Sequence, residues 1–120
     1  MITGVHAIMY AKDADATRKF LREVLELPNV DGGRGWLIFA LPPAEIAAHP
    51  VENEGDEEHE LFLMCDNLKT TMAELSKKGI EFVGGVNEQR WGLLATLRVP
   101  GGGTMCLYEP RHPTAIGLKK

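Results

Sequence analysis

Residues 60–82 read ELFLMCDNLKTTMAELSKKGIEF: a short apolar run, a polar residue suited to capping a helix, and an amphipathic stretch with helical spacing. Residues 6–27, HAIMYAKDADATRKFLREVLEL, follow the same plan. Two further apolar runs follow each stretch, at 36–41 and 45–49 in the first half and at 92–99 and 104–109 in the second. The repeat predicts two copies of one β-α-β-β-β unit, each too small to bury a core alone.

Composition and charge restrict the class of protein. The chain has 120 residues, 44% of them hydrophobic and 25% charged, which is typical of one globular domain. Its net charge of −4, with no basic stripe, argues against a nucleic-acid partner. The first residues lack the pattern of a signal peptide, and no apolar run reaches transmembrane length. We therefore expect a cytoplasmic protein with no membrane partner, and reduced thiols at Cys65 and Cys106.

The first unit, about residues 3–50, is predicted to begin with a buried strand at 4–11. A helix capped by Asp13 follows and ends before Pro28, because proline closes a helix. A turn and the strands 36–41 and 45–49 complete the unit. One side of the helix is predicted to be buried through Phe20, Leu21, Val24 and Leu25.

The second unit, about residues 59–110, follows an acidic linker at about 51–58, VENEGDEE. Asn67 is predicted to cap its helix, and Gly79 supplies the left-handed residue at the end. The remaining segments are predicted as a strand at 80–83, a turn at Gly84-Gly85, a strand at 92–99, a hairpin loop at 100–103, a strand at 104–109 and a loosely held tail at 111–120.

The sequence resembles the vicinal oxygen chelate superfamily of glyoxalases, bleomycin resistance proteins and extradiol dioxygenases. The resemblance rests on the paired units, the strand from His6 toward Asp13, and the closing runs EIAAHP (45–50) and TMCLYEP (104–110). It covers about residues 3–110. It implies an α+β fold in which two βαβββ modules form an incompletely closed, eight-stranded cupped sheet with the helices outside. In the metal-using members, the first and last strands of each module point ligands into the cup.

Four residues at repeat-related positions are candidate metal ligands. His49 and Glu109 are equivalent, because each ends its strand and directly precedes a proline. His6 opens the first unit, and the side chains of a strand alternate between its two faces. Its counterpart in the second unit is Glu60 if Asn67 matches Asp13, as the helical patterns favour. The predicted metal ligands are His6, His49, Glu60 and Glu109.

The alternative to Glu60 is His59, which precedes Asp66 by the same spacing that separates His6 from Asp13. A shift of one residue reverses the face of a strand, so the choice changes the ligand set. On the Glu60 assignment, an apolar wall would surround the ion, made of Ile8, Tyr10, Phe62 and Met64.

The two ligand sets predict different chemistry. Two imidazoles with the carboxylates of Glu60 and Glu109 suit a divalent Ni, Co, Zn, Mn or Fe ion, the ligand count that the resemblance to glyoxalase I implies. Such an ion would stabilise an enediolate-type intermediate, with Glu60 or Glu109 as the catalytic base. His6, His59 and Glu109 would instead form the two-histidine, one-carboxylate face of an Fe²⁺ dioxygenase.

The leading functional hypothesis is therefore a glyoxalase-like, metal-dependent lyase or isomerase that acts on a small carbonyl compound. The alternatives are an extradiol-type ring-cleaving dioxygenase and a non-catalytic small-molecule binding or resistance protein of the same fold. A homodimer is expected, since members of the superfamily often pair and sometimes exchange modules.

Overall fold

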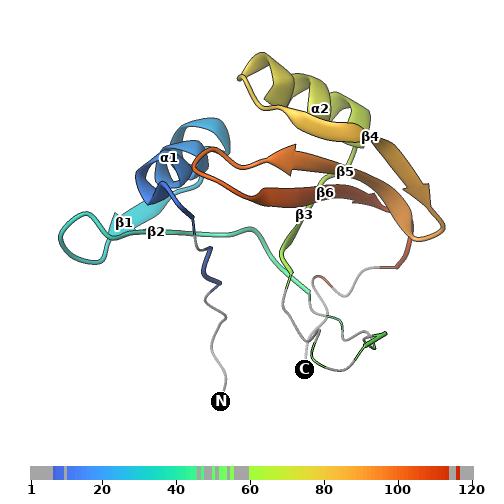
Figure 1. Cartoon of the computed structure of the whole chain (residues 1–120), viewed down its shortest axis with the longest axis horizontal. Helices are drawn as coiled ribbons and strands as arrows, with labels where there is room; N and C mark the ends of the chain where they lie inside the picture. Colours follow the sequence, from blue (N-terminus) through green and yellow to red (C-terminus); the bar gives the residue numbers. More distant parts are fainter. Residues whose placement is uncertain are drawn as a thin grey trace.

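The computed structural model describes residues 7–9, 11–45, 47, 50, 52–53, 55, 60–113 and 116. Each of two helical segments is followed by three strands along this part of the chain, which makes it an α+β protein (Figure 1). No helix in these ranges is long and apolar enough to cross a membrane. The elements are α1 (Ala14–Lys19), the π-helical turn η1 (Phe20–Val24), β1 (Asn29–Asp31), β2 (Leu37–Phe39), β3 (Phe62–Met64), α2 (Leu68–Lys77), β4 (Phe82–Gln89), β5 (Gly92–Arg98) and β6 (Thr104–Pro110).

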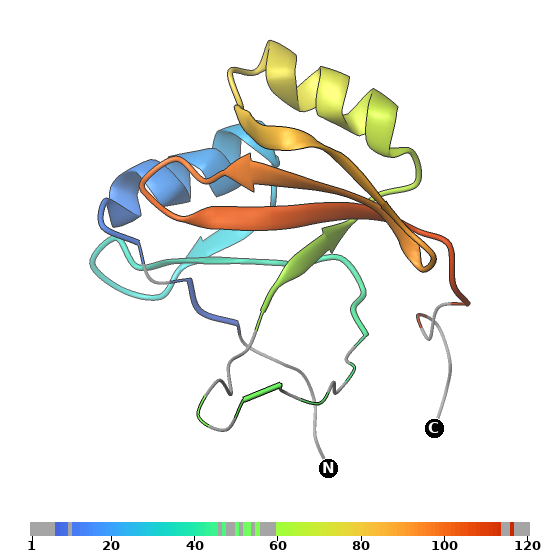
Figure 2. The same ribbon diagram turned by 45° about the vertical axis from the view of Figure 1, so that its right-hand side comes forward.

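The second half of the chain forms a four-stranded sheet in the order β3-β6-β5-β4. β3 runs parallel to β6, and the other neighbours are antiparallel. The helix α2 lies along one side of this sheet (Figures 1 and 2). The predicted strands at 92–99 and 104–109 and the hairpin between them are confirmed.

The helix α2 begins and ends where the sequence predicts. The Asn67 side chain accepts a hydrogen bond from the Thr70 amide at 2.9 Å, and Gly79 has a positive φ of 88°. The apolar side of α2 packs against β5 and β6 to make the core. The buried hydrophobic residues of this cluster are Phe20, Leu68, Leu75, Ile80, Ala95, Leu97, Val99, Met105 and Leu107.

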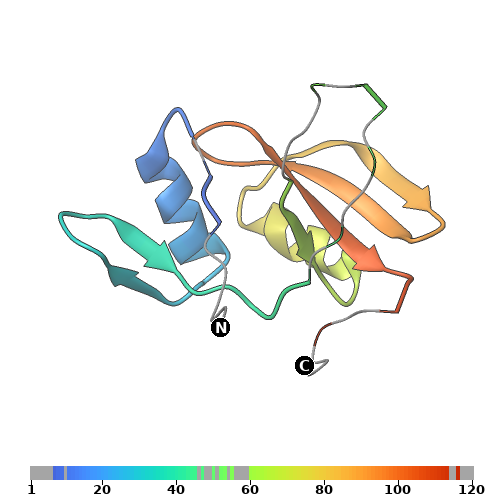
Figure 3. The same ribbon diagram turned by 90° about the horizontal axis from the view of Figure 1, so that it is seen from below.

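The first half contributes α1, η1 and the two-stranded sheet β1-β2, which lie beside the larger sheet (Figure 3). Asp13 caps α1 as predicted, accepting from the Ala16 amide at 3.1 Å. Phe20 is buried, and the rest of the predicted stripe, Leu21, Val24 and Leu25, packs against the core.

The β5–β6 hairpin holds α1 in place. The Thr17 hydroxyl donates to the Pro100 carbonyl at 2.7 Å, and the Asp13 amide donates to the Gly101 carbonyl at 2.9 Å. A Cβ added at Gly101 would overlap Asp13 O and Thr17 Oγ1, so this close approach requires glycine. The two halves are thus joined by backbone as well as by Phe20.

The strands of the first half differ from the prediction. Residues 7–9 and 11 are not in a strand, and the rest of the expected strand at 4–11 lies outside the described residues. Glu45 and Ala47 are likewise irregular, and His49 lies outside the described part. β1, which the sequence did not predict, pairs with β2 instead. Six strands are therefore present in the described ranges, and an eight-stranded cup is not confirmed.

One turn in the second half was also placed wrongly. Gly84 and Gly85 lie inside β4, where the pairing with β5 shifts between Val83 and Asn87. The glycines form an irregularity in a longer strand, as is common for glycine in sheets, and the chain turns at Arg90 and Trp91. Most of the acidic linker, and all of the tail except 111–113 and 116, lie outside the described residues.

Candidate functional site

The two faces of the four-stranded sheet differ in what covers them. Alternate residues of β6, among them Leu107, point to the side where α2 packs, because they belong to the core cluster with Leu68 and Leu75. The opposite side, here called the open face, carries residues of three paired strands. By register and alternation these are Phe62, Met64, Leu94, Thr96, Cys106 and Tyr108.

Tyr108 is the centre of an aromatic cluster on the open face. The rings of Phe62 and Trp91 meet its ring edge to face, with centroids 5.9 Å and 5.5 Å away. The ring of His112 stacks at 6.0 Å. Tyr108 is only 8% exposed, whereas Phe62 and Trp91 are 36% and 41% exposed. The cluster therefore presents aromatic surface outward over a buried base.

His112 holds one end of this cluster through both ring nitrogens. Nδ1 lies 2.8 Å from the Pro113 carbonyl oxygen, which can only accept, so Nδ1 carries a proton. In the neutral ring Nε2 is then the acceptor for the Tyr108 hydroxyl, 3.4 Å away. Burial, and after it the negative charge of Glu45, raises the pKa of Tyr108. Tyr108 therefore stays a hydrogen-bond donor at neutral pH.

A cavity of about 460 Å³ lies at the other end of the sheet. It is bounded by Ile8 and Met9 of the first half, by the segment before β3, and by the β5–β6 hairpin. Glu60 lines it and is exposed. The remaining lining residues are Leu61, Val99, Gly102, Gly103, Thr104, Met105 and Cys106.

Glu109 has a different environment. Its Oε1 accepts a hydrogen bond from the Leu68 amide at 2.9 Å, at the first residue of α2. Glu109 thus lies on the helix-covered side of the sheet, where a carboxylate satisfies a free amide and faces the positive end of the helix dipole.

The structure does not bring Glu60 and Glu109 to one point. Phe62 pairs with Cys106 in parallel register, which sets Glu60 level with Thr104. Glu109 lies five residues farther along β6, roughly 16 Å at about 3.3 Å per residue. It also points to the other face. The described residues thus give no support for the two carboxylates meeting around one ion, and that part of the ligand set stays a prediction.

The other predicted ligands, His6 and His49, lie outside the described residues, as does the alternative ligand His59. Within the described ranges, no group of three or more His, Cys, Asp or Glu residues could hold a metal ion. The histidine part of the predicted site therefore stays a prediction. Both cysteines are free thiols and only partly buried.

The sequence reasoning missed Tyr108 and His112. Because it took Glu109 as a ligand, it placed the ligand-bearing face of β6 on the side of Glu109, whereas the open face belongs to the alternate residues. The available signal was one aromatic residue beside each strand end, Trp91 and Tyr108, which antiparallel pairing of 92 with 110 brings together.

Comparison with known proteins gives similarity in structure only. No family model and no curated protein sequence matches the chain. A lactoylglutathione lyase from Agrobacterium tumefaciens superposes with a TM-score of 0.62 at 18% identity, over 89% of this chain and 92% of that one. TnmS3, an antibiotic binding protein from Streptomyces sp. CB03234, gives 0.58 at 20% identity, over 88% and 99%.

A third solved structure, a member of the glyoxalase/bleomycin resistance protein/dioxygenase superfamily from Sphaerobacter thermophilus, gives a TM-score of 0.61 at 18% identity, over 90% of this chain and 98% of that one. These likenesses establish the fold: the chain has the glyoxalase-like fold that its sequence predicted. Both enzymes and binding proteins have this fold, so the fold does not show which function the chain has. The function must be argued from the site.

Proposed function

We propose that the protein binds a small, largely apolar aromatic molecule on the open face of its sheet, against Phe62, Trp91 and Tyr108. One observation carries the proposal: two aromatic rings stay more than a third exposed while they pack edge-on against a buried third. Exposed aromatic surface above a fixed base is typical of ligand sites, where it supplies contact area with little loss of side-chain freedom.

Polar groups beside the rings would orient the ligand. The Tyr108 hydroxyl donates its proton to His112 Nε2, and its oxygen still offers an acceptor at one edge of the cluster. The likeness to TnmS3 supports this class of function, because that protein of the same fold is an antibiotic binding protein.

Binding is tested with the uncharged, planar dye Nile red and the full chain. We expect its fluorescence to rise saturably, and Trp91→Ala to weaken binding about tenfold or more, since burying a large apolar side chain is worth about 1.5–3 kcal/mol. Trp36→Ala is the matched control, because Trp36 is 51% exposed and lies next to β2, in the other half. Equal effects of the two changes would contradict the proposal.

The second candidate function is the metal-dependent lyase or isomerase acting on a small carbonyl compound. Its support is Glu60, an exposed carboxylate beside a cavity, and the likeness to a lactoylglutathione lyase. Members of the superfamily typically use divalent metals. Because Glu109 is held by α2, the described residues do not supply the two-carboxylate ligand set, and such an ion would depend on His6, His49 and Glu60.

Metal analysis of the purified chain separates the enzymatic alternatives. Stoichiometric Ni, Co, Zn or Mn that is lost in His6→Ala and Glu60→Gln but kept in Glu109→Gln would support a site built on the first three residues. Fe²⁺ with oxygen uptake on a catechol would favour the dioxygenase. If His6→Ala leaves the metal content unchanged, the proposed site is contradicted.

We also propose that the protein forms a homodimer. Each chain would contribute its two modules, about residues 3–50 and 59–110, and pairing of the chains would complete the cup. Both halves expose large apolar side chains, and Val30 and Leu41 of the first half are 65% and 46% exposed. Sedimentation equilibrium would show twice the chain mass of 13.2 kDa. A monomer at micromolar concentration would contradict it.

A further inference from the structure

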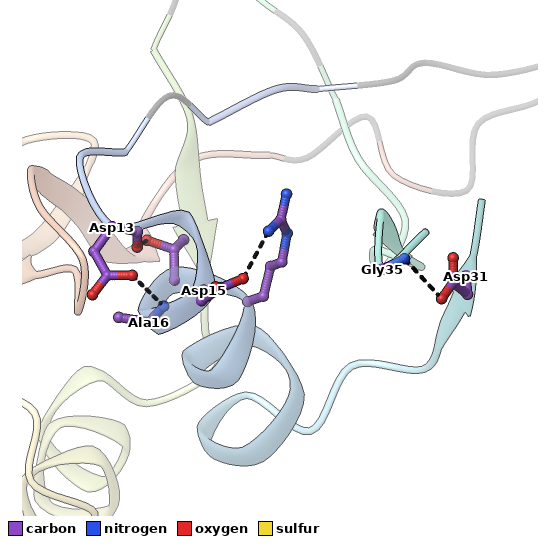
Figure 4. Close-up of polar contacts among 7 residues, drawn as sticks. Asp13, Asp15, Ala16, Asp31 and Gly35 are labelled. Atoms are coloured by element: carbon purple, nitrogen blue, oxygen red, sulfur yellow. Dashed lines mark hydrogen bonds and ion pairs between the residues drawn. The ribbon is translucent and has the colours of Figure 1, made fainter. Parts of the chain in front are cut away.

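A second cavity, of about 370 Å³, lies in the first half, on the side of α1 and η1 that faces the β1–β2 turn. Figure 4 shows Asp15 on the helix, with Asp31 and Gly35 of the turn across from it. Its lining residues are Asp15, Arg18, Lys19, Arg22, Gly35 and Leu37. We call this cavity the basic groove. The aromatic cluster of the open face is made of other residues.

Helical spacing gathers the cations of the basic groove. Arg18 and Arg22 are four residues apart, so they lie on the same side of a helix, and Lys19 is adjacent. Phe20, which is 2% exposed, anchors the opposite side of η1 in the core. The burial of Phe20 therefore turns the arginines toward the turn.

The residues that line the groove include three cations and one carboxylate, Asp15. Asp15 forms an ion pair with Arg18, with 2.9 Å between Oδ1 and Nη1. Glu23 lies 4.0 Å from Lys19 and 3.6 Å from Arg22, longer than the ~2.8 Å of a charge-assisted hydrogen bond, so one carboxylate is shared loosely by two cations.

The acid of the turn is already engaged. Asp31 accepts from the amides of Gly33 at 2.7 Å and Gly35 at 3.2 Å. The next cation along the chain, Arg34, follows in the same turn with a positive φ of 53°. Counted over its lining residues alone, the basic groove carries more positive than negative charge, beside an apolar side chain, Leu37.

We propose that the basic groove binds a small organic anion through a phosphate or carboxylate group. Arg22 and Lys19 contact the anionic oxygens, because a guanidinium binds them in a two-pronged geometry and an ammonium adds a point charge. Leu37 contacts the apolar part of the ligand. The volume fits a small molecule and excludes a folded partner. The inference is independent of the function proposed for the open face.

The test is a titration of the ¹⁵N-labelled full chain followed by amide chemical shifts, with phenyl phosphate and benzoate as the two probes. We expect saturable shifts confined to residues 18–22 and 33–37, with affinity that falls as salt rises. The probe with the lower Kd identifies the anionic group. Arg22→Gln should raise the Kd about tenfold, as expected for loss of a paired guanidinium contact worth about 1.4 kcal/mol.

Lys69→Gln is the matched control, because it removes the same charge from an exposed position on α2. Its Kd should equal that of the parent chain. Should Arg22→Gln disturb the fold, Arg22→Lys keeps the charge and should weaken binding only a few-fold. Shifts that do not saturate, that appear on the open face, or that change equally in the Lys69 variant would overturn the proposal.

Discussion

The two halves of the chain carry the same sequence plan, and their described residues form different structures. Their helices begin alike, with Asp13 and Asn67 each accepting from the amide three residues on, at 3.1 Å and 2.9 Å. Their sheets differ over the residues that the structure describes: the second half builds four paired strands, and the first contributes two strands of three residues each. Among the described residues, Phe20 is the one buried hydrophobic of the first half.

The difference follows from the strand sequences. β5 and β6 are apolar on both sides, so they pack against α2 and still pair with each other. In the first half, Pro28 precedes β1, and Pro42, Pro43 and Pro50 follow β2. Proline lacks the amide that a sheet ladder needs, which keeps strands short. Equivalent helices therefore do not guarantee equivalent sheets.

Removing a core side chain of the second half should have the largest effect. Leu97 is 0% exposed, and Leu97→Ala should lower the free energy of unfolding by about 2–5 kcal/mol through the cavity it leaves. Leu41→Ala is the control in the first half, at 46% exposure, with an expected loss below about 0.5 kcal/mol. Urea denaturation measures both, and similar losses would show that the first half carries an equal share of the core.

The junction between the halves should come next. Gly101→Ala would place a Cβ against Asp13 O and Thr17 Oγ1, and should cost about 1–3 kcal/mol. Gly103→Ala has the same kind of positive φ, 81°, with no atom nearby, and therefore reports backbone strain alone. Hydrogen exchange should accelerate in α1 and spare α2 in the first variant relative to the second. Equal exchange in both would mean that the hairpin does not hold α1.

The matched caps give a smaller and more direct comparison. Asn67→Ala should destabilise the chain by about 0.5–2 kcal/mol, because α2 forms part of the common core. Asp13→Ala should release mainly the amides of α1 to exchange, with less change in the urea midpoint. A larger shift of the midpoint in the Asp13 variant would reverse the proposed ranking of the halves.

The smallest effect concerns the segment between β3 and α2. Burial, more than the charges of Glu109 and Asp66, raises the pKa of the Cys65 thiol. A side-chain hydrogen bond with Thr71 lowers this pKa in part. A raised pKa in the folded state adds stability below about pH 8.5 that is lost as the pH rises. In a Cys106→Ser background, iodoacetamide should therefore alkylate Cys65 more slowly at pH 8.5 in the native chain than in urea.

The repeat supplies the control for this last experiment. Ala11 precedes Asp13 by the same two residues that separate Cys65 from Asn67. A thiol placed by Ala11→Cys, with both native cysteines changed to Ser, should react faster than Cys65. A slower reaction would show that the start of the first half is packed as tightly as its counterpart.

Much of the second half could be predicted because its signals are local. A cap at Asn67, an apolar stripe through Leu75 and a glycine at 79 act over three or four residues, and tertiary packing agrees with them. The candidate site could not be predicted in the same way. Thr104–Pro110 is apolar on both sides, so alternation alone cannot say which side faces α2.

Glu109 shows the consequence. Its position before a proline matched that of His49, but its carboxylate accepts a hydrogen bond from the amide of Leu68, which has no partner within α2. The aromatic cluster could not be predicted from local sequence either, because Tyr108 meets Trp91 and Phe62 only after three strands pair.

The sequence by itself determined where the two helices begin and where β5 and β6 lie, because these depend on neighbours close along the chain. Tertiary structure alone decided which side each strand residue faces, how far the first half forms strands, and which charges meet in the basic groove. The physical reason is that side-chain facing is set by pairing between distant segments, and a shift of one residue reverses it without changing the local pattern.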